Sequence, residues 1–289
     1  MTVRDALPTA PSNRFREKPI IETVGERFRG LPLGPRVRRW LKHLYLGALM
    51  LRSGGRGLQC VLPDGEHIRA LPEFRHISWN PSEYRAFKKA IRPGHVALDV
   101  GANVGAYALL LGQWVGPGGR VFAFEPVAEV HAALTRHVDL NGLGAVVRPI
   151  EMALADRESA TSLIVSGTSG ESRLAAPGED GEVRDVRSTT IDAFCAREGV
   201  APDFIKIDVE GWEVSVLRGA RETIRSRGAA LALFVELHPS IWPSLKMSRR
   251  DLEMELDVQN LELAPLTPGE DPWSVEGVAV RLTRRGAAI

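Results

Sequence analysis

The sequence predicts an α/β fold: a mostly parallel seven-stranded sheet with helices on both faces and an antiparallel hairpin at one edge. Two observations support this prediction. From residue 96 onward, short apolar runs alternate with segments of roughly ten to fifteen residues that have helical spacing, and this is the pattern of βαβ units around a parallel sheet. The last two apolar runs are joined only by the turn-rich segment 267–277, which favours an antiparallel pair.

The elements before residue 96 are fewer and shorter. Residues 1 to about 30 are rich in Pro, Arg and Glu and are expected to be loosely ordered. A helix is predicted over 36–52, ended by "SGG", and a hairpin over 57–71, turning at "PDG". The segment "NPSEYRAFKKAI" at 80–91 offers an N-cap asparagine followed by proline at the first helical position.

The core elements follow in regular alternation. Strands are predicted at 96–100, 120–126, 145–154, 204–209, 230–239, 261–266 and 278–283. Helices are predicted at 106–115, 127–141, 188–198, 212–227 and 248–259. The polar, Gly- and Ser-rich segment 166–185 has no period and reads as a lid or a disordered insert. Three segments are therefore expected: a basic extension with a helix (1–56), a hairpin and helix (57–92), and a ligand-binding domain (93–289).

Composition excludes several classes of protein. The 289 residues carry a net charge of +1, so no overall charge drives the chain towards nucleic acid, although the first sixty residues are rich in arginine. The apolar segment 40–51 is too short to span a membrane and contains charge; docking on the main domain or on a second subunit explains it better. Cys60 and Cys195 lack metal or redox spacing. With no apolar signal sequence, a cytoplasmic protein is expected.

The segment "DFIKIDVEGWEV" at 203–214 carries charged residues in a strand that is expected to be buried. Its apolar residues alternate with Lys206, Asp208 and Glu210. A half-exposed strand would explain this pattern, but the order of elements places the strand in the middle of a parallel sheet, where unpaired buried charge is costly. The carboxyl ends of such strands face the ligand site. The charges are therefore expected at that edge, with Lys206 paired to an acid.

A glycine loop, "LDVGANVGAY", lies between the first core strand and its helix. Gly101 permits the tight turn and Gly105 permits close packing where the helix begins. Asp99 stands where a carboxylate would repel a pyrophosphate but attract an ammonium or sulfonium group, and Glu125 ends the next strand at the spacing of a ribose-binding acid. The pattern favours S-adenosylmethionine over NAD. The competing explanation is that both acids merely cap helices.

The motifs "LDVGANVGAY", "FAFEP", "MALAD", "TTIDAF", "IKIDVEGWEVSVLRGA" and "VELHP" together resemble the FkbM family of S-adenosylmethionine-dependent methyltransferases over about residues 57–240. The resemblance implies the Rossmann-like class I methyltransferase fold and O-methylation of hydroxyls on sugars or secondary metabolites. It implies that the cofactor is bound by Asp99, Gly101, Ala102, Asn103, Gly105, Glu125, Pro126, Ala153, Leu154 and Asp208. Of these, Glu125 would hold the ribose, and Ala153 and Leu154 would lie along the adenine.

An alcohol nucleophile must lose its proton during methyl transfer. His238 has a suitable pKa range and is the favoured base; the alternative is a capping or packing histidine. Asp208 could contact both the cofactor and the acceptor hydroxyl, and Glu210 is a second candidate base. A different assignment makes Asp208, Glu236 and His238 ligands of a divalent ion. No spacing singles this assignment out, so a metal is not favoured.

Two other functions remain open. One is aminopropyl transfer from decarboxylated S-adenosylmethionine, against which Asp99 argues because it suits an intact methionine tail. The other is a non-catalytic nucleotide-binding scaffold. The expected partner is a small hydroxylated molecule, with no nucleic acid and no membrane span, and a homodimer through the N-terminal region is possible.

Overall fold

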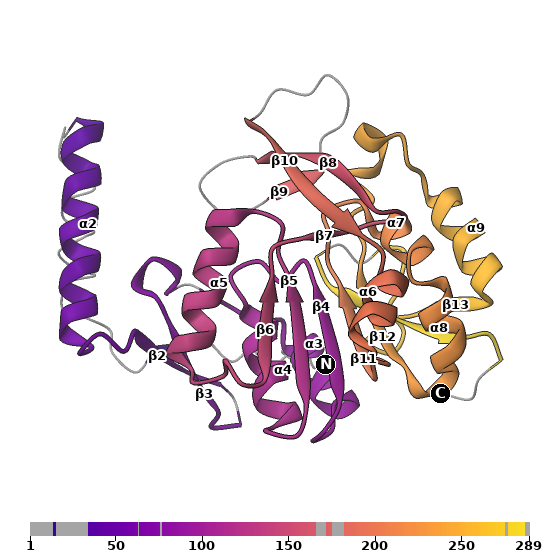
Figure 1. Ribbon diagram of the computed structural model, residues 1–289, viewed down its shortest axis with the longest axis horizontal. Coiled ribbons are helices and arrows are strands. Elements are labelled where there is room, and N and C mark those ends of the chain that lie inside the picture. The colour runs from indigo at the N-terminus through magenta and orange to yellow at the C-terminus, as the bar shows by residue number, and fades with distance from the viewer. Residues whose placement is uncertain are drawn as a thin grey trace, which may run out of the picture. The chain divides into compact units, whose positions relative to one another are not determined.

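The computed structural model describes residues 14–15, 34–62, 64–75, 77–165, 172–174, 182–274 and 277–286 (Figure 1). By its contacts the chain divides into two compact units, Met1–Pro81 and Ser82–Ile289. The unit that contains the predicted site begins at Ser82. The functional boundaries expected at 56 and 92 stay predictions.

The first unit contains the predicted helix and hairpin. Its helix is α2 (Pro35–Arg52), and β1 (Arg14–Phe15), β2 (Leu58–Val61) and β3 (His67–Ala70) form an antiparallel sheet in the order β1-β2-β3. A short 3-10 helix, η1 (Pro72–Phe74), follows. Within the part of the chain that the structure describes, no helix is sufficiently long and apolar to span a membrane.

The second unit is built on the predicted seven-stranded sheet. Its strands are β4 (Val96–Val100), β5 (Arg120–Phe124), β6 (Val147–Ile150), β11 (Phe204–Ile207), β12 (Ala232–Glu236), β13 (Leu261–Ala264) and β14 (Ala279–Arg284). They lie in the order β13-β14-β12-β11-β4-β5-β6. The five strands from β12 to β6 pair in parallel, and β14 pairs antiparallel with both β12 and β13. The predicted sheet, its edge hairpin and the central place of β11 are confirmed.

Helices cover both faces of this sheet. They are α3 (Pro81–Ala90), α4 (Ala106–Val115), α5 (Ala128–Leu140), α6 (Ile191–Glu198), α7 (Glu213–Arg218), α8 (Arg221–Arg227) and α9 (Arg249–Gln259). Two short 3-10 helices, η2 (Gly228–Ala230) and η3 (Trp242–Leu245), flank β12.

Aromatic contacts identify the two faces. Phe87 of α3 packs edge-on against Phe204 and Phe234, with ring centroids 5.4 and 4.8 Å apart. Phe194 of α6 packs in the same way against Phe124 of β5, at 4.8 Å. Phe204 is followed by Ile205, which belongs to the core cluster of Phe124 and Phe194. Because neighbouring strand residues point to opposite faces, α3 and α6 cover opposite faces.

The prediction of one helix over 212–227 is wrong. The structure has two helices, α7 and α8, separated at Gly219 and Ala220. A Cβ atom added at Gly219 would lie 2.0 Å from the carbonyl oxygen of Ala155. The helix therefore breaks where its backbone touches a neighbouring segment, and helical periodicity cannot reveal such a contact.

The region after β6 also differs from the prediction. The single strand expected over 145–154 is interrupted, and a second, four-stranded sheet in the order β7-β10-β8-β9 follows (Figure 1). Its strands are β7 (Ala153–Leu154), β8 (Ser159–Val165), β9 (Ser172–Leu174) and β10 (Glu182–Thr189). The predicted lid at 166–185 is therefore partly strand, while 166–171 and 175–181 lie outside the described residues. The helix expected from 188 begins at Ile191, because Ser188 and Thr189 belong to β10.

Candidate functional site

The predicted site residues lie at the carboxyl ends of four neighbouring strands. Val100 of β4 pairs with Phe124 of β5 on one side and with Ile207 of β11 on the other, and Ile207 pairs with Val235 of β12. The four parallel strands therefore end together at one edge, here called the carboxyl rim. It carries Asp99, Glu125, Asp208, Glu210, Glu236 and His238, all within three residues of a strand end.

Lys206, the buried cation of the charged strand, is paired with two acids of the rim. Its ammonium group is 3.0 Å from Oδ2 of Asp208 and 3.7 Å from Oδ1 of Asp99, and its side chain is almost fully buried. Burial alone would lower the pKa of Lys206, but the charges of Asp208 and Asp99 raise it above its ordinary value. A protonated lysine thus lies between two rim acids, as predicted, and reduces their mutual repulsion.

The glycine loop packs directly against the end of β11. Gly101 has a φ of +80°, and a Cβ atom there would lie 1.7 Å from the backbone oxygen of Asp208. Gly105 has a φ of +96°, and its Cβ would lie 2.6 Å from a methyl group of Leu134 in α5. Both positions need glycine for backbone conformation and for space. The loop therefore packs the carboxyl ends of β4 and β11 against each other.

Glu125 fixes the other side of the same loop. Its Oε2 accepts a hydrogen bond from the backbone N–H of Asn103 at 3.1 Å, and its Oε1 accepts one from that of Val127 at 2.9 Å. The residue is 4% exposed. Burial raises the pKa of Glu125 to about 7, against the effect of the two backbone hydrogen bonds. Asn103 has a φ of +49°, so Glu125 stabilises a strained turn of the loop.

The raised pKa of Glu125 makes part of the stability depend on pH. Its pKa is about 7 in the folded chain against 4.5 as its reference value, so the folded state binds this proton more tightly. The contribution is complete below pH 4.5 and is lost as pH rises to 7, amounting to about 3 kcal/mol. We expect Glu125→Gln to reduce this pH dependence in denaturant titrations. Glu151→Gln, at an exposed site, is the control, and an unchanged slope in Glu125→Gln would contradict the assignment.

His238 is held by a residue that the sequence analysis missed. Nδ1 of His238 lies 2.7 Å from Oε1 of Glu213, whose side chain is fully buried. The same carboxylate accepts hydrogen bonds from the backbone N–H of Gly211 and from the indole N–H of Trp242, both at 2.8 Å. In this contact Nδ1 of His238 is assigned the proton that Glu213 accepts, and Nε2 faces the rim.

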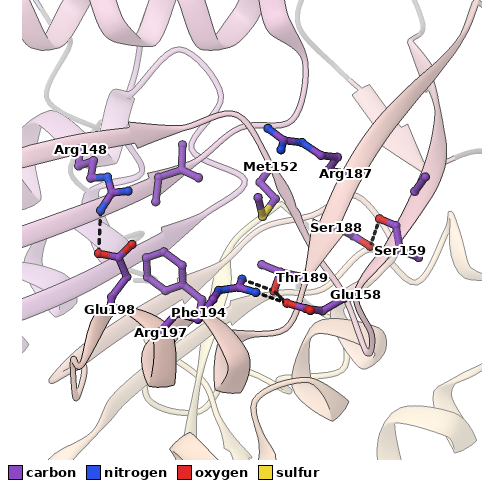
Figure 2. Close-up of a pocket in the computed structure, with 12 residues that line it drawn as sticks. Arg148, Met152, Glu158, Ser159, Arg187, Ser188, Thr189, Phe194, Arg197 and Glu198 are labelled. Atoms are coloured by element: carbon purple, nitrogen blue, oxygen red, sulfur yellow. Dashed lines mark hydrogen bonds and ion pairs between the residues drawn. The ribbon is translucent and has the colours of Figure 1, made fainter.

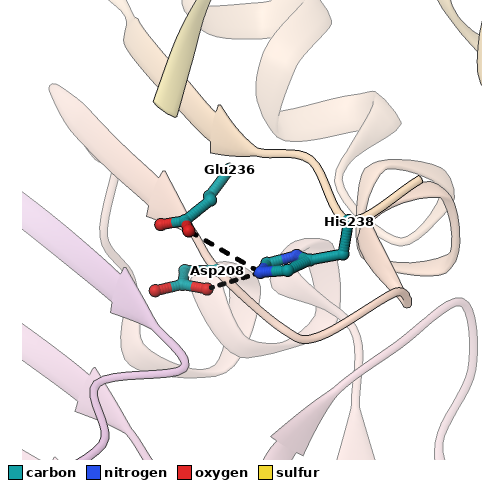
Figure 3. Close-up of side chains that lie close together, drawn as sticks. All are labelled: Asp208, Glu236 and His238. Carbon is teal, nitrogen blue, oxygen red and sulfur yellow. Dashed lines mark ion pairs between the residues drawn. The ribbon is translucent and has the colours of Figure 1, made fainter. Parts of the chain in front are cut away.

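Three carboxylates surround the other ring nitrogen of His238. Asp208, Glu210 and Glu236 each place an oxygen 3.7 Å from Nε2, and Figure 3 shows two of them. Burial lowers the pKa of His238, but Glu213 and then Asp208 and Glu210 raise it to about 9. Burial, followed by the charge of Asp208, raises the pKa of Glu236 to about 7. Ligand atoms of Asp208, Glu236 and His238 lie within 4.8 Å of one another and could hold a metal ion.

Two of the predicted cofactor contacts are more deeply buried than expected. Asp99 is 0% exposed, and neither of its carboxylate oxygens has a hydrogen-bond donor among the described residues. Burial raises its pKa. Leu154 belongs to the main core cluster, whereas Ala153 packs with Val127, two residues after Glu125. The structure thus brings Ala153 towards the rim and places Leu154 in the interior.

A model of the methyltransferase FkbM domain matches residues 99–271. The match spans the glycine loop, the whole carboxyl rim and β13. The chain belongs to the FkbM methyltransferase family.

Individual relatives and solved structures match different shares of the chain. The hexuronic acid methyltransferase AglP of Haloferax volcanii is 30% identical over 154 residues, which cover 51% of this chain and 58% of AglP. The FkbM methyltransferase of Methylobacillus flagellatus superposes with a TM-score of 0.39 and 21% identity, covering 70% of this chain and 50% of the other. The fibrillarin of Aeropyrum pernix gives a TM-score of 0.41 and 16% identity over 78% and 93%. This chain thus spans just over half the length of AglP.

A separate pocket of about 450 Å³ lies beside the second sheet (Figure 2). It is lined by Arg148, Ile150, Met152, Glu158, Ser159, Ala160, Arg187, Ser188, Thr189, Phe194, Arg197 and Glu198. Arg148 pairs with Glu198 at 2.7 Å, and Glu158 accepts from Thr189 and pairs with Arg197. Of the "MALAD" motif only Met152 lines this pocket. This pocket was not predicted, because part of its lining, including Ser159, Ala160 and Arg187, belongs to β8 and β10, which the sequence analysis missed.

Proposed function

We propose that this FkbM-family chain transfers the methyl group of S-adenosylmethionine to a hydroxyl of a sugar-type acceptor, with hexuronic acids as the first class to test. The family match and the name of the AglP relative support this proposal. The observation that carries the proposal is that two features lie on the same rim: the glycine loop, which is hydrogen-bonded to Glu125, and the cluster of Asp208 and His238.

The residues present suit the cofactor. Neither carboxylate oxygen of Asp99 has a hydrogen-bond donor among the described residues, and Lys206 approaches only Oδ1, at 3.7 Å, so an ammonium group that reached Oδ2 would supply a missing bond. We propose that Asp99, with the loop Gly101, Ala102, Asn103 and Gly105, holds the methionine end. Glu125 and Pro126 would lie at the ribose, and Ala153 and Leu154 near the adenine. When bound, the cofactor supplies an activated methyl group, and the protein aligns the acceptor and excludes water.

The acceptor proton is proposed to pass to the cluster of His238, Asp208 and Glu210. Glu213 orients the ring of His238 so that Nε2, not Nδ1, faces the two other side chains. A group that takes up a proton must lie within hydrogen-bond reach of the hydroxyl. Asp208 adjoins both the glycine loop and His238, which suits a residue between cofactor and acceptor.

We propose further that the protein works in the cytoplasm on a small molecule. Its two cysteines are buried free thiols, as is usual in a reducing compartment. A homodimer through the N-terminal region is also proposed, because α2 exposes Trp40 (60%) and Leu51 (83%), and such side chains are common in interfaces.

Mass analysis of the products tests the proposed reaction. The protein would be incubated with S-adenosylmethionine and, separately, with hexuronic acid glycosides and the matching neutral hexosides. We expect a mass increase of one methylene unit on the acceptor and formation of S-adenosylhomocysteine. Transfer of an aminopropyl group would support the alternative enzyme class. Tight cofactor binding without transfer to any hydroxylated acceptor would favour the scaffold protein.

A further inference from the structure

The cluster around His238 has the geometry of a cation site. Nε2 of His238 is 3.7 Å from an oxygen of each of Asp208, Glu210 and Glu236 (Figure 3). This separation is longer than a normal N–H···O hydrogen bond of about 2.7–3.2 Å. Two ligand atoms that each lie about 2.1 Å from one ion are separated by up to about 4.2 Å. Nε2 is therefore close enough to each carboxylate for one ion to contact both, and the ligand atoms of Asp208, Glu236 and His238 all lie within 4.8 Å of one another.

The second observation is the orientation of the imidazole. His238 is 8% exposed, and Glu213 accepts the Nδ1 proton at 2.7 Å. Gly211 and Trp242 also donate to Glu213, so the carboxylate is held in place and orients the imidazole ring. With Nδ1 turned to Glu213, Nε2 points at oxygens of Asp208, Glu210 and Glu236, so a cation between them would contact the imidazole and the carboxylates together. A histidine that donates its other N–H to a carboxylate is the usual arrangement at a metal.

Lys206 does not occupy this position. It contacts Oδ2 of Asp208 at 3.0 Å, whereas Oδ1 of the same carboxylate faces His238. One oxygen of Asp208 is thus bound to the lysine and the other remains for an ion. The ion pairs of the rim connect five carboxylates to Lys206 and His238: Asp99, Asp208, Glu210, Glu213 and Glu236. This excess of negative charge would attract a divalent cation.

We propose that Asp208, Glu236 and His238 bind a divalent cation of the Mg²⁺ or Mn²⁺ class, with Glu210 beside it. Two carboxylates and one imidazole form an oxygen-rich set without thiolate, which favours these ions over Zn²⁺. Its catalytic role rests on the proposed function. The ion would stabilise the acceptor oxygen as the O–H bond breaks, the proton would pass to Glu210, and the oxygen would then form a C–O bond as the C–S bond of the cofactor breaks. His238 would then be a ligand and not the base.

Titration with Mn²⁺ tests the site without relying on catalysis. The full chain, freed of metal with EDTA, would be titrated with Mn²⁺ while the signal of free Mn²⁺ is followed by electron paramagnetic resonance. We expect one site, with affinity at least tenfold weaker in Asp208→Asn and in Glu236→Gln. Glu255→Gln removes a carboxylate that pairs with Arg221 and takes no part in the rim, and it is the control. Circular dichroism would show that each variant is folded. His238→Asn removes the third ligand and is also expected to bind Mn²⁺ weakly.

The outcomes separate this inference from the proposed reaction. If the wild type failed to bind Mn²⁺, or if the wild type and the rim variants bound it equally, the metal site would be overturned. Methyl transfer in the presence of EDTA would then show that the proposed reaction still holds. If Mn²⁺ binding is lost in the rim variants, the metal site is supported. If no acceptor is methylated by the same protein, the proposed reaction fails and the metal site stands.

Discussion

Replacing Gly101 with alanine is expected to abolish binding of S-adenosylhomocysteine and to destabilise the second unit by several kcal/mol. The new Cβ atom would lie 1.7 Å from the backbone oxygen of Asp208, and the backbone there has a φ of +80°. Both effects act at once, since a left-handed conformation costs a non-glycine residue about 1–2 kcal/mol and overpacking typically costs about 1–3 kcal/mol more. The loop and the end of β11 must separate, which would displace Asp208. Calorimetric titration and thermal unfolding measure the two effects.

Gly94→Ala is the matched control for this substitution. Gly94 has a φ of +87°, and a Cβ atom there would meet nothing within 4 Å. Gly94→Ala therefore introduces the backbone strain without a steric clash. We expect its free energy of unfolding to fall by about 1–2 kcal/mol and its binding of S-adenosylhomocysteine to be unchanged. If Gly101→Ala and Gly94→Ala lowered stability equally and both bound the ligand, the close approach of the loop to β11 would be refuted.

Glu213→Gln is expected to lower the rate of methyl transfer by about 10²–10⁴-fold while the chain remains folded. An amide in place of the carboxylate can donate to Nδ1 of His238, so the ring would move its proton to Nε2. In that tautomer the nitrogen facing Asp208 and Glu236 neither accepts a proton nor binds a cation. A tautomer change of this kind costs about 10⁴-fold in a serine protease triad, and loss of a residue that supports a metal ligand costs about 10–100-fold in affinity or activity.

Glu255→Gln serves as control for this variant as well. Glu255 of α9 is 2% exposed and pairs with Arg221 of α8, away from the rim. Its loss should lower thermal stability without changing the tautomer of His238. The ¹⁵N chemical shifts of the imidazole report the tautomer directly, with His238→Asn identifying the signals. An unchanged tautomer and an unchanged rate in Glu213→Gln would show that Glu213 is only a packing residue.

The rim was predictable because each of its groups follows a recognisable strand. Asp99 and Glu125 stand at the ends of "VALDV" and "RVFAF", and parallel strands bring such ends to one edge. The charged strand was informative for the same reason: Lys206 could lie in a buried strand only if acids paired with it, and the structure pairs it with Asp208 and Asp99.

The parts that were missed depend on contacts between distant segments. Glu213 begins α7, where an acid is favoured by the helix dipole, and nothing in the sequence links it to His238, 25 residues later. The break at Gly219 arises from the carbonyl of Ala155. The second sheet includes polar strands such as β10, which lacks the apolar alternation that marks a core-facing strand.

Titration of the chain with S-adenosylhomocysteine most directly tests the central claim, that Asp99, Glu125 and Asp208 at three neighbouring strand ends form one cofactor site. We predict one binding site per chain in the wild type and at least tenfold weaker binding in Glu125→Ala, with Glu151→Ala unchanged. Absence of binding in the folded wild type, or equal binding in all three proteins, would contradict the account.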